Sequence, residues 1–276
     1  MAKLKACLAL GLIVTCAACT LTIDQRTFFP NDTREVSDSF VAPPGYAVRD
    51  EIFDLGDVGK VHALLLDNPD SSGVVLYSGG NGHYIAEQSE RAAALALASG
   101  FDVILYDYPD RGGTTVDASI PAMLAAYPLL VERFRQDDWI KDGPLFAYGL
   151  SFGGSQAAAI VREKGFDGLI IEGSSPDLLK IGRDFVPGIM KLFVNLELDP
   201  KLAEFAYYDY VRDASIPVLL ISSENDEIIR PARMRDFDKR LAADGVDVRS
   251  VSVKGPHGSA LRQEDGLAAV RDFVRR

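Results

Sequence analysis

The sequence is poor in cysteine and histidine and has no excess of basic residues. Its three cysteines, Cys7, Cys16 and Cys19, all lie near the N-terminus, which excludes a disulfide framework. The 29 Lys and Arg residues face 40 Asp and Glu, a net charge of −11. This balance excludes a general nucleic-acid binder, because such proteins need basic residues to displace counterions from phosphates.

Length and composition indicate an ordinary globular protein. The chain has 276 residues, of which 47% are hydrophobic and 25% charged. That is long enough for one large α/β domain or two small ones, and too apolar for wholesale disorder. No internal repeat, low-complexity tract or second domain is visible.

The N-terminus has the pattern of a secretory signal peptide. Lys3 and Lys5 precede an uncharged stretch over residues 6–23, which ends in small residues. The run Cys16-Ala17-Ala18-Cys19 resembles the bacterial lipobox, although that motif prefers Leu where this chain has Cys16. The resemblance implies that residues 1–18 are removed and that Cys19 is lipidated.

Three alternatives stay open for this segment. Cys16 is a weaker candidate for lipidation, because Thr15 is a poor residue to cleave after. The uncharged stretch is also just long enough for an uncleaved membrane anchor, and an unlipidated secreted form is possible. The lipoprotein, the anchored form and the secreted form all place the domain outside the cytoplasm. In a Gram-negative cell the lipobox resemblance implies the periplasmic face of the outer membrane, because Thr20 is not the Asp associated with inner-membrane retention.

Residues 19–44 are predicted to be a tether, and residues 45–276 a single domain. The tether is polar and rich in turn residues, including Pro30, Pro43 and Pro44. Within the domain, short apolar runs alternate with helical patterns, which predicts an α/β fold with a doubly wound, mostly parallel sheet. The predicted strands are 61–66, 74–77, 103–106, 145–148, 169–171, 218–221 and 246–253, and the predicted helices are 85–99, 155–161, a helix from Pro231 to the residues before Gly245, and a last helix through 267–274.

One interval breaks this alternation. About forty residues, rich in Leu, Ile, Phe and Tyr, separate the strand near Glu172 from the strand at Val218. They form either helices that pack on the sheet like the others or a small helical cap, at 174–216, whose apolar residues line a substrate pocket. The two interpretations can hold for different parts of the segment.

Ser151 is the predicted nucleophile. The sequence Gly149-Leu150-Ser151-Phe152-Gly153 follows a predicted strand and precedes a helical run, which is the context of a G-x-S-x-G nucleophile elbow. Glycines suit this turn because side chains at 149 or 153 would collide with the neighbouring strand and helix. The helix N-terminus directs partial positive charge at an oxyanion formed on Ser151.

Ser151 needs a base, and the chain has three histidines. His62 lies inside a predicted strand and is interpreted as structural. His83 lies in a glycine-rich loop, where it either contacts substrate or has a structural role. His257 follows the late strand, in a loop just before the last helix, and is the predicted base.

An acid orients the base and stabilises its charged form. Asp226, after the strand at 218–221, is the predicted acid, and Glu224 is the second candidate. The order Ser151, Asp226, His257 is that of the α/β-hydrolase triad.

The backbone N–H groups of Phe152 and Asn81 are the predicted oxyanion hole. Asn81 lies in the glycine-rich run 78–83, where the backbone can approach a substrate oxygen closely. This run does not indicate a phosphate site, because the lysine and threonine of a P-loop are absent.

With these motifs, residues 49–276 resemble an α/β-hydrolase of the BEM46-like type, close to the serine aminopeptidase group. The resemblance rests on residues 76–82, 105–108 and 148–154 and on Asp226 and His257. The chain departs from the family in having Gly79-Gly80 where His-Gly is usual, and 109–114 in place of an Arg-Gly-x-Gly-x-Ser turn.

The resulting expectation is a serine hydrolase that cleaves carboxylic esters through an acyl-enzyme, with no cofactor and no metal. Its expected partners are a small or lipid-like acyl substrate and the membrane that holds its N-terminus. A peptidase or amidase and a thioesterase are alternatives on the same triad. A different class, a membrane-tethered binding protein without turnover, is motivated by the altered oxyanion loop. Oligomeric state cannot be predicted from these patterns.

Overall fold

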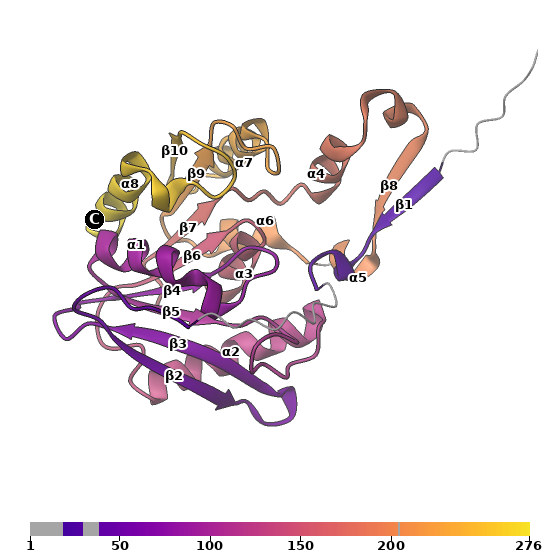
Figure 1. Ribbon diagram of the computed structural model, residues 1–276. Helices are drawn as coiled ribbons and strands as arrows, with labels where there is room; N and C mark the ends of the chain where they lie inside the picture. The colour runs from indigo at the N-terminus through magenta and orange to yellow at the C-terminus, as the bar shows by residue number, and fades with distance from the viewer. Residues whose placement is uncertain (1–18, 30–38, 204) are drawn as a thin grey trace, which may run out of the picture.

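The body of the protein is an eight-stranded sheet covered by helices on both faces (Figure 1). The structure, a computed structural model, describes residues 19–29, 39–203 and 205–276. The strand order is β10-β9-β7-β6-β4-β5-β3-β2. In chain order these strands are β2 (Ala47–Asp54), β3 (Lys60–Asp67), β4 (Val74–Ser78), β5 (Asp102–Tyr106), β6 (Leu145–Leu150), β7 (Gly168–Glu172), β9 (Val218–Ser223) and β10 (Val248–Val253).

The sheet is mostly parallel. Only the pairs β2–β3 and β3–β5 are antiparallel, and the five pairs between β10 and β5 are parallel. The predicted α/β fold with a doubly wound, mostly parallel sheet is therefore confirmed. A parallel arrangement brings the carboxyl ends of β4, β6, β7, β9 and β10 to one edge, which is where sites form in open α/β sheets.

Two hydrophobic layers cover the sheet. One layer packs against α1 (Ser89–Ser99) and α8 (Glu264–Val274), and the other against α2 (Ile120–Gln136), α3 (Phe152–Ile160), α6 (Tyr207–Asp213) and α7 (Pro231–Ala243). Within β4, Val75 and Tyr77 belong to the first layer, whereas Val74 and Leu76 belong to the second. This burial on both faces explains why the central strands are continuous apolar runs without alternation.

The elements that sequence analysis did not assign have less regular patterns. β2 is an edge strand whose residues are mostly exposed, so its sequence AVRDEIFD contains many charged positions. α2 contains Pro128 in its interior, where a proline removes a helical N–H, and begins with a proline in its first turn. Both are held by packing: the ring of Phe53 on β2 lies edge-on to Phe134 of α2 and to Trp139.

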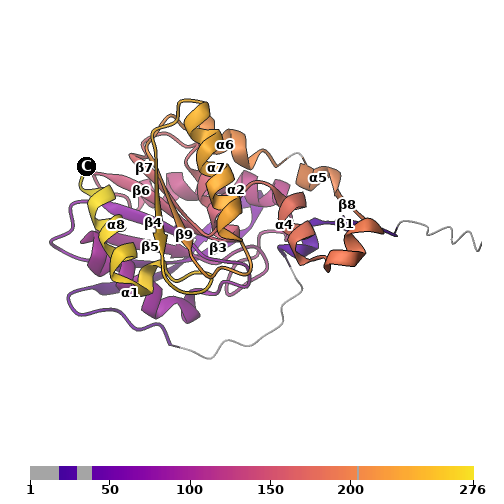
Figure 2. The ribbon, with the colours of Figure 1, turned by 90° about the horizontal axis from the view of Figure 1, so that it is seen from above.

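Residues 173–217 divide into two parts. α4 (Leu178–Phe185), the 3-10 helix η4 (Gly188–Leu192), β8 (Val194–Leu198) and α5 (Pro200–Ala203) form a cap that projects from the body in both views (Figures 1 and 2). α6, which follows, packs against α3 and buries Val211. The first part thus corresponds to the interpretation as a small cap, and α6 to the interpretation as a helix that packs like the others.

The N-terminal segment Cys19–Phe29, expected to be part of a tether, folds into the cap. β1 (Cys19–Ile23) pairs with β8 in parallel, with Cys19 opposite Val194. A 3-10 helix, η1 (Gln25–Thr27), follows, and the ring of Phe28 stacks on Phe152 with centroids 4.8 Å apart. The tether prediction gave weight to the polar and turn residues of this segment. The segment also contains four large apolar residues that can pack against the cap and the body: Leu21, Ile23, Phe28 and Phe29.

The proposed signal peptide (1–18) and residues 30–38 of the proposed tether lie outside the described residues. Within the described part of the chain, no helix combines the length and the apolar character needed to cross a membrane.

His62 connects three parts of the fold through its two ring nitrogens. Nδ1 lies 2.7 Å from Asp107 Oδ2, after β5, and Nε2 lies 2.8 Å from Asp50 Oδ1 on β2. The hydrogen bond to Asp107 and the charges of both carboxylates raise the pKa of His62 from 6.5 to about 9. At neutral pH His62 is therefore a charged, structural residue.

We expect His62→Gln to lower the free energy of unfolding by about 2 kcal/mol below pH 6.5. Because folding raises this pKa, the stabilisation is complete below pH 6.5 and is lost as the pH rises through about 9. Urea unfolding of both proteins between pH 6 and pH 10 measures the difference. A difference that does not change with pH would contradict this role.

Candidate active site

Ser151 lies on a sharp turn between β6 and α3, in a backbone conformation that side chains rarely adopt. Its φ is +55° and its ψ is −120°. A Cβ on Gly153 would collide with the carbonyl oxygens of Ser78 and Gly79, and one on Gly149 would collide with the backbone of Gly153. The glycines therefore allow β6, α3 and the loop after β4 to approach closely enough to impose this turn.

Asp226 and His257 form a hydrogen-bonded pair at the same edge of the sheet. Asp226 Oδ2 lies 2.7 Å from His257 Nδ1, and its carboxylate is almost fully buried. The other oxygen, Oδ1, accepts hydrogen bonds from the backbone N–H groups of Ile228, at 2.9 Å, and Ile229, at 2.7 Å. These contacts orient the carboxylate, which in turn orients the imidazole ring.

His257 is accessible enough to act on a neighbouring hydroxyl. Its side chain is 17% exposed, and its Nε2 has no hydrogen-bond partner among the described residues. Gly173 provides the space for the ring: its φ is +53°, and a Cβ there would lie 3.0 Å from His257 Cε1. Ser151 approaches the same place from β6, because its N–H donates to the carbonyl of Glu172, directly before Gly173.

Glu172, at the end of β7, holds the loop that carries His257. Its Oε1 accepts a hydrogen bond from the Ala260 N–H, and its Oε2 accepts one from the Tyr148 hydroxyl, both at 2.7 Å. Arg91 on α1 donates to the carbonyl of Gly258, in the same loop, at 2.7 Å. Sequence analysis did not single out these residues, because a carboxylate at a strand end has no local signature of this role.

The other two histidines make contacts within the fold, with groups other than Ser151. Both ring nitrogens of His62 face carboxylates, so neither can accept a proton from Ser151. His83 is buried, with its Nε2 3.1 Å from the Tyr106 carbonyl oxygen, and burial lowers its pKa to about 4. His83 is thus a neutral residue beneath the glycine-rich loop, in agreement with the structural interpretation.

The structure brings both predicted oxyanion donors to the cavity beside Ser151. Phe152 is the first residue of α3, so its N–H has no acceptor within the helix. Asn81 lines the same cavity, and its side chain donates to the Thr27 carbonyl at 2.8 Å. Gly80 also lies near Ser151, since a Cβ there would be 3.8 Å from the Cβ of Ser151. The loop at 80–81 can therefore direct backbone N–H groups at a substrate oxygen.

Ser151 opens into a cavity of about 460 Å³ between the body and the cap. None of the described residues that line it is charged. The cap contributes Leu178, Ile181 and Phe185, and the N-terminal segment contributes Ile23 and Phe28. The part played by the N-terminal segment was missed, and the adjacent Phe28 and Phe29 were the signal that could have indicated it.

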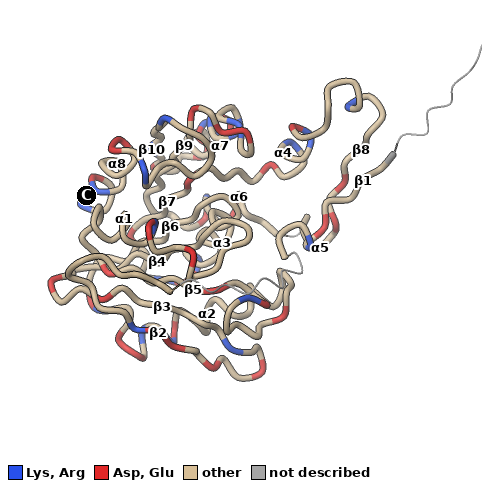
Figure 3. Tube along the Cα trace, viewed as in Figure 1, with Lys and Arg blue, Asp and Glu red and all other residues tan. Residues whose placement is uncertain are grey.

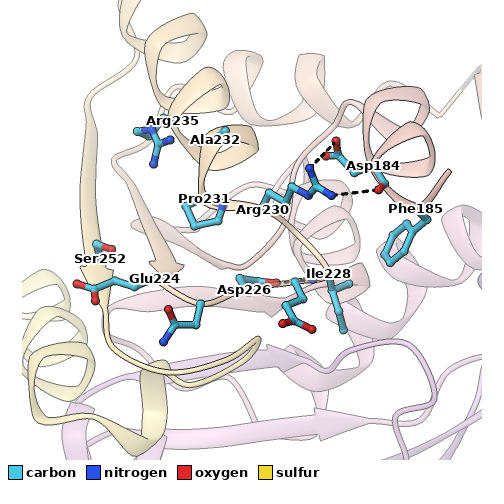
Figure 4. A pocket seen from close by; sticks show the side chains of 12 residues that line it. Asp184, Phe185, Glu224, Asp226, Ile228, Arg230, Pro231, Ala232, Arg235 and Ser252 are labelled. Atoms are coloured by element: carbon cyan, nitrogen blue, oxygen red, sulfur yellow. Dashed lines mark hydrogen bonds and ion pairs between the residues drawn. The ribbon is translucent and has the colours of Figure 1, made fainter. Parts of the chain in front are cut away.

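A larger hollow, of about 1060 Å³, lies along the loop after β9, and Ser151 does not line it (Figure 4). Glu224, Arg230 and Arg235 make its lining charged, and Arg230 points toward Asp184 of the cap. Both candidates for the acid, Asp226 and Glu224, line this hollow, and the bond to His257 comes from Asp226. In the described part of the chain, no cluster of three or more His, Cys, Asp or Glu residues could hold a metal ion.

Comparisons of sequence and of structure give different results. No protein-family profile and no curated protein matches the chain in sequence. Among solved structures, carboxyl esterase 2 from the fungus Tuber melanosporum is 19% identical, with 90% of each chain covered and a TM-score of 0.62. The esterase Pf2001 from Pyrococcus furiosus is 16% identical. The match covers 88% of this chain and 99% of the esterase chain, with a TM-score of 0.65. An acylaminoacyl peptidase from Pyrococcus horikoshii is 15% identical. The match covers 84% of this chain and 41% of the peptidase chain, with a TM-score of 0.62.

At these identities the likeness concerns the fold. The eight-stranded, mostly parallel sheet and its helices match the esterase structures over most of both chains. The chain therefore has the α/β-hydrolase fold.

Proposed function

We propose that the protein is a serine hydrolase that cleaves carboxylic esters, with Ser151 as nucleophile, His257 as base and Asp226 as the orienting acid. The observations that carry the proposal are the Asp226–His257 hydrogen bond, with the carboxylate held by two backbone N–H groups, and a serine in an elbow conformation whose N–H donates to Glu172, the residue before Gly173. The similarity in fold to esterases supports the same reaction class.

The reaction proceeds in two halves. Ser151 Oγ attacks the acyl carbon of the ester while its proton moves to Nε2 of His257, and the backbone N–H groups of Phe152 and Asn81 stabilise the oxyanion. The His257 imidazolium then donates that proton to the leaving alcohol, and an acyl-enzyme remains. A water molecule gives a proton to His257 and attacks the acyl carbon, which releases the carboxylic acid and returns the proton to Ser151.

The uncharged cavity favours an ester over a peptide with a free N-terminus. An aminopeptidase needs a carboxylate near the scissile bond to bind the substrate's ammonium group, and no described residue of the cavity lining carries one. An acyl chain instead matches the Leu, Ile and Phe side chains of the lining. Amides, thioesters and a role as a binding protein without turnover are the alternatives. We also propose, from the sequence motifs, that the protein is related to the BEM46-like hydrolases.

We also propose that Cys19 is lipidated and that the domain works outside the cytoplasm, at a membrane. Support comes from the sequence, in which Lys3 and Lys5 precede an uncharged stretch that ends in small residues and Cys19. This attachment would bring the cap, through β1, to the membrane surface.

We expect Ser151→Ala to lower turnover of a short-chain ester by a factor of about 10⁴ or more, because it removes the nucleophile. A fluorophosphonate probe should label the parent protein and not this variant. Ser155→Ala is the matched control: Ser155 lines the same cavity, but its hydroxyl donates to the Phe152 carbonyl, so labelling should persist. A folded parent that neither labels nor turns over esters would favour the binding protein.

We expect Asp226→Asn to lower turnover by a factor of about 10³ to 10⁴, because the amide no longer holds the required tautomer of His257. Glu224→Gln should leave turnover within a factor of two to three, roughly the effect of a surface substitution. Steady-state kinetics of the two variants compare the candidates for the acid directly. The reverse order of effects would assign the acid to Glu224.

We expect an alkyne-tagged fatty acid, fed to cells that express the full chain, to label the parent and not Cys19→Ala. Cys16→Ala should be labelled like the parent, which separates the two candidate cysteines. Labelling that depends on Cys16, or an unlabelled parent that keeps residues 1–18 by mass spectrometry, would replace this proposal with one of the alternatives.

A further inference from the structure

The outer end of the cap exposes a cluster of large apolar side chains. We call Phe185, Ile189, Met190, Leu192 and Phe193 the cap tip. The exposed fraction of the residue is 80% for Leu192, 74% for Ile189 and 60% for Phe185. They are close in sequence, at the end of α4, in η4 and directly after η4, and all five are exposed. Contiguous apolar patches of this kind mark contact surfaces for a membrane, a protein or a ligand.

The charge around the cap tip differs from that of the whole protein. Residues 185–196 contain no acidic side chain and one basic side chain, Lys191, although the chain as a whole has a net charge of −11. Figure 3 shows this end of the cap mostly in tan. An acidic protein is repelled by anionic lipid headgroups, so a surface without acidic residues is the one that can approach them.

Cys19, the proposed point of membrane attachment, lies near the cap tip. Cys19 begins β1 and lies opposite Val194 of β8, the residue after Phe193. The residues before it, 6–18, are uncharged. A lipid on Cys19 would therefore be attached beside the cap tip.

An ion pair joins the cap to the body directly beside the cap tip. Asp184, at the end of α4, accepts two hydrogen bonds from Arg233 of α7, at 2.8 and 2.9 Å. The bond to Arg233 lowers the pKa of Asp184, so the pair is charged at neutral pH. Phe185 follows directly and belongs both to the cap tip and to the lining of the Ser151 cavity. An apolar surface therefore leads from the cap tip toward the nucleophile.

We propose that the cap tip is a membrane-docking surface, whose apolar side chains enter the outer part of a lipid bilayer. The substrate class that follows is an acyl ester held in that bilayer, which reaches Ser151 past Phe185. The docking rests on the proposed membrane attachment, and the substrate class rests on the proposed esterase activity.

The docking is tested by fluorescence on the full chain reconstituted into phospholipid vesicles. A polarity-sensitive fluorophore is attached to a cysteine at the cap tip, in Leu192→Cys, and the labelled parent measures the background from native cysteines. Leu97→Cys is the matched control, because Leu97 is 62% exposed on α1, on the opposite side of the body from the cap (Figure 1). The fluorophore at 192, and not the one at 97, should shift to shorter wavelength and be quenched by brominated lipids.

Two results would overturn the docking. One is an equal exposure to water at both positions in vesicles. The other is shielding of position 192 without lipid, together with a dimer in sedimentation, because the cap tip would then bind a second copy of the chain.

The substrate class is tested with the double variant Ile189→Asp, Leu192→Asp, neither residue of which lines the Ser151 cavity. Hydrolysis of an acyl ester in vesicles should fall about tenfold, while hydrolysis of a soluble butyrate ester stays unchanged. Leu97→Asp should alter neither rate. An equal loss on both substrates, or no loss on either, would contradict the proposal. A parent inactive on both esters would refute the esterase function, and the fluorophore would still decide the docking.

Discussion

The close approach of three backbone segments around Ser151 is the constraint on which the site depends. A non-glycine residue at φ +55° costs about 1–3 kcal/mol, and it persists only where its surroundings impose it. Here the Ser151 N–H donates to Glu172, the Ser151 carbonyl accepts from Gly154, and Gly153 lies against the carbonyls of Ser78 and Gly79. The buried layers of the sheet hold these segments together, so the conformation of one serine reflects the packing of the whole body.

The parallel sheet brings the remaining groups to that serine. Ser151, Asp226 and His257 follow β6, β9 and β10, while Glu172 ends β7, which lies between β6 and β9. Each loop is short, so its side chain stays at the carboxyl edge of the sheet. Glu172 has no part in the proposed proton transfers, yet its side chain accepts a hydrogen bond from the Ala260 N–H and so connects β7 to the loop that carries His257.

The cap gives the site its chemical character. Its helix α4 is joined to α7 by Asp184 with Arg233 and by Asp177 with Arg240. The side chains that face Ser151 are uncharged, and those at the outer end are apolar and exposed. A single short segment thus combines ionic contacts with the body and an apolar lining for the cavity beside Ser151.

Local sequence determined the elements whose cause is itself local. Glycines around Ser151 indicate a tight turn, and short apolar runs indicate strands buried on both faces, so the fold class could be predicted and Ser151 could be named as the candidate nucleophile. The sequence could name Asp226 and His257 as candidate partners, but only the tertiary structure shows which groups each histidine contacts. His62 and His257 lie equally close to an aspartate, at 2.7 Å, but the second nitrogen of His62 is taken by Asp50. Likewise, β1 pairs with β8, far along the chain, and Phe28 reaches Phe152. Such contacts depend on which segments the folded sheet brings together, and no short stretch of sequence contains that information.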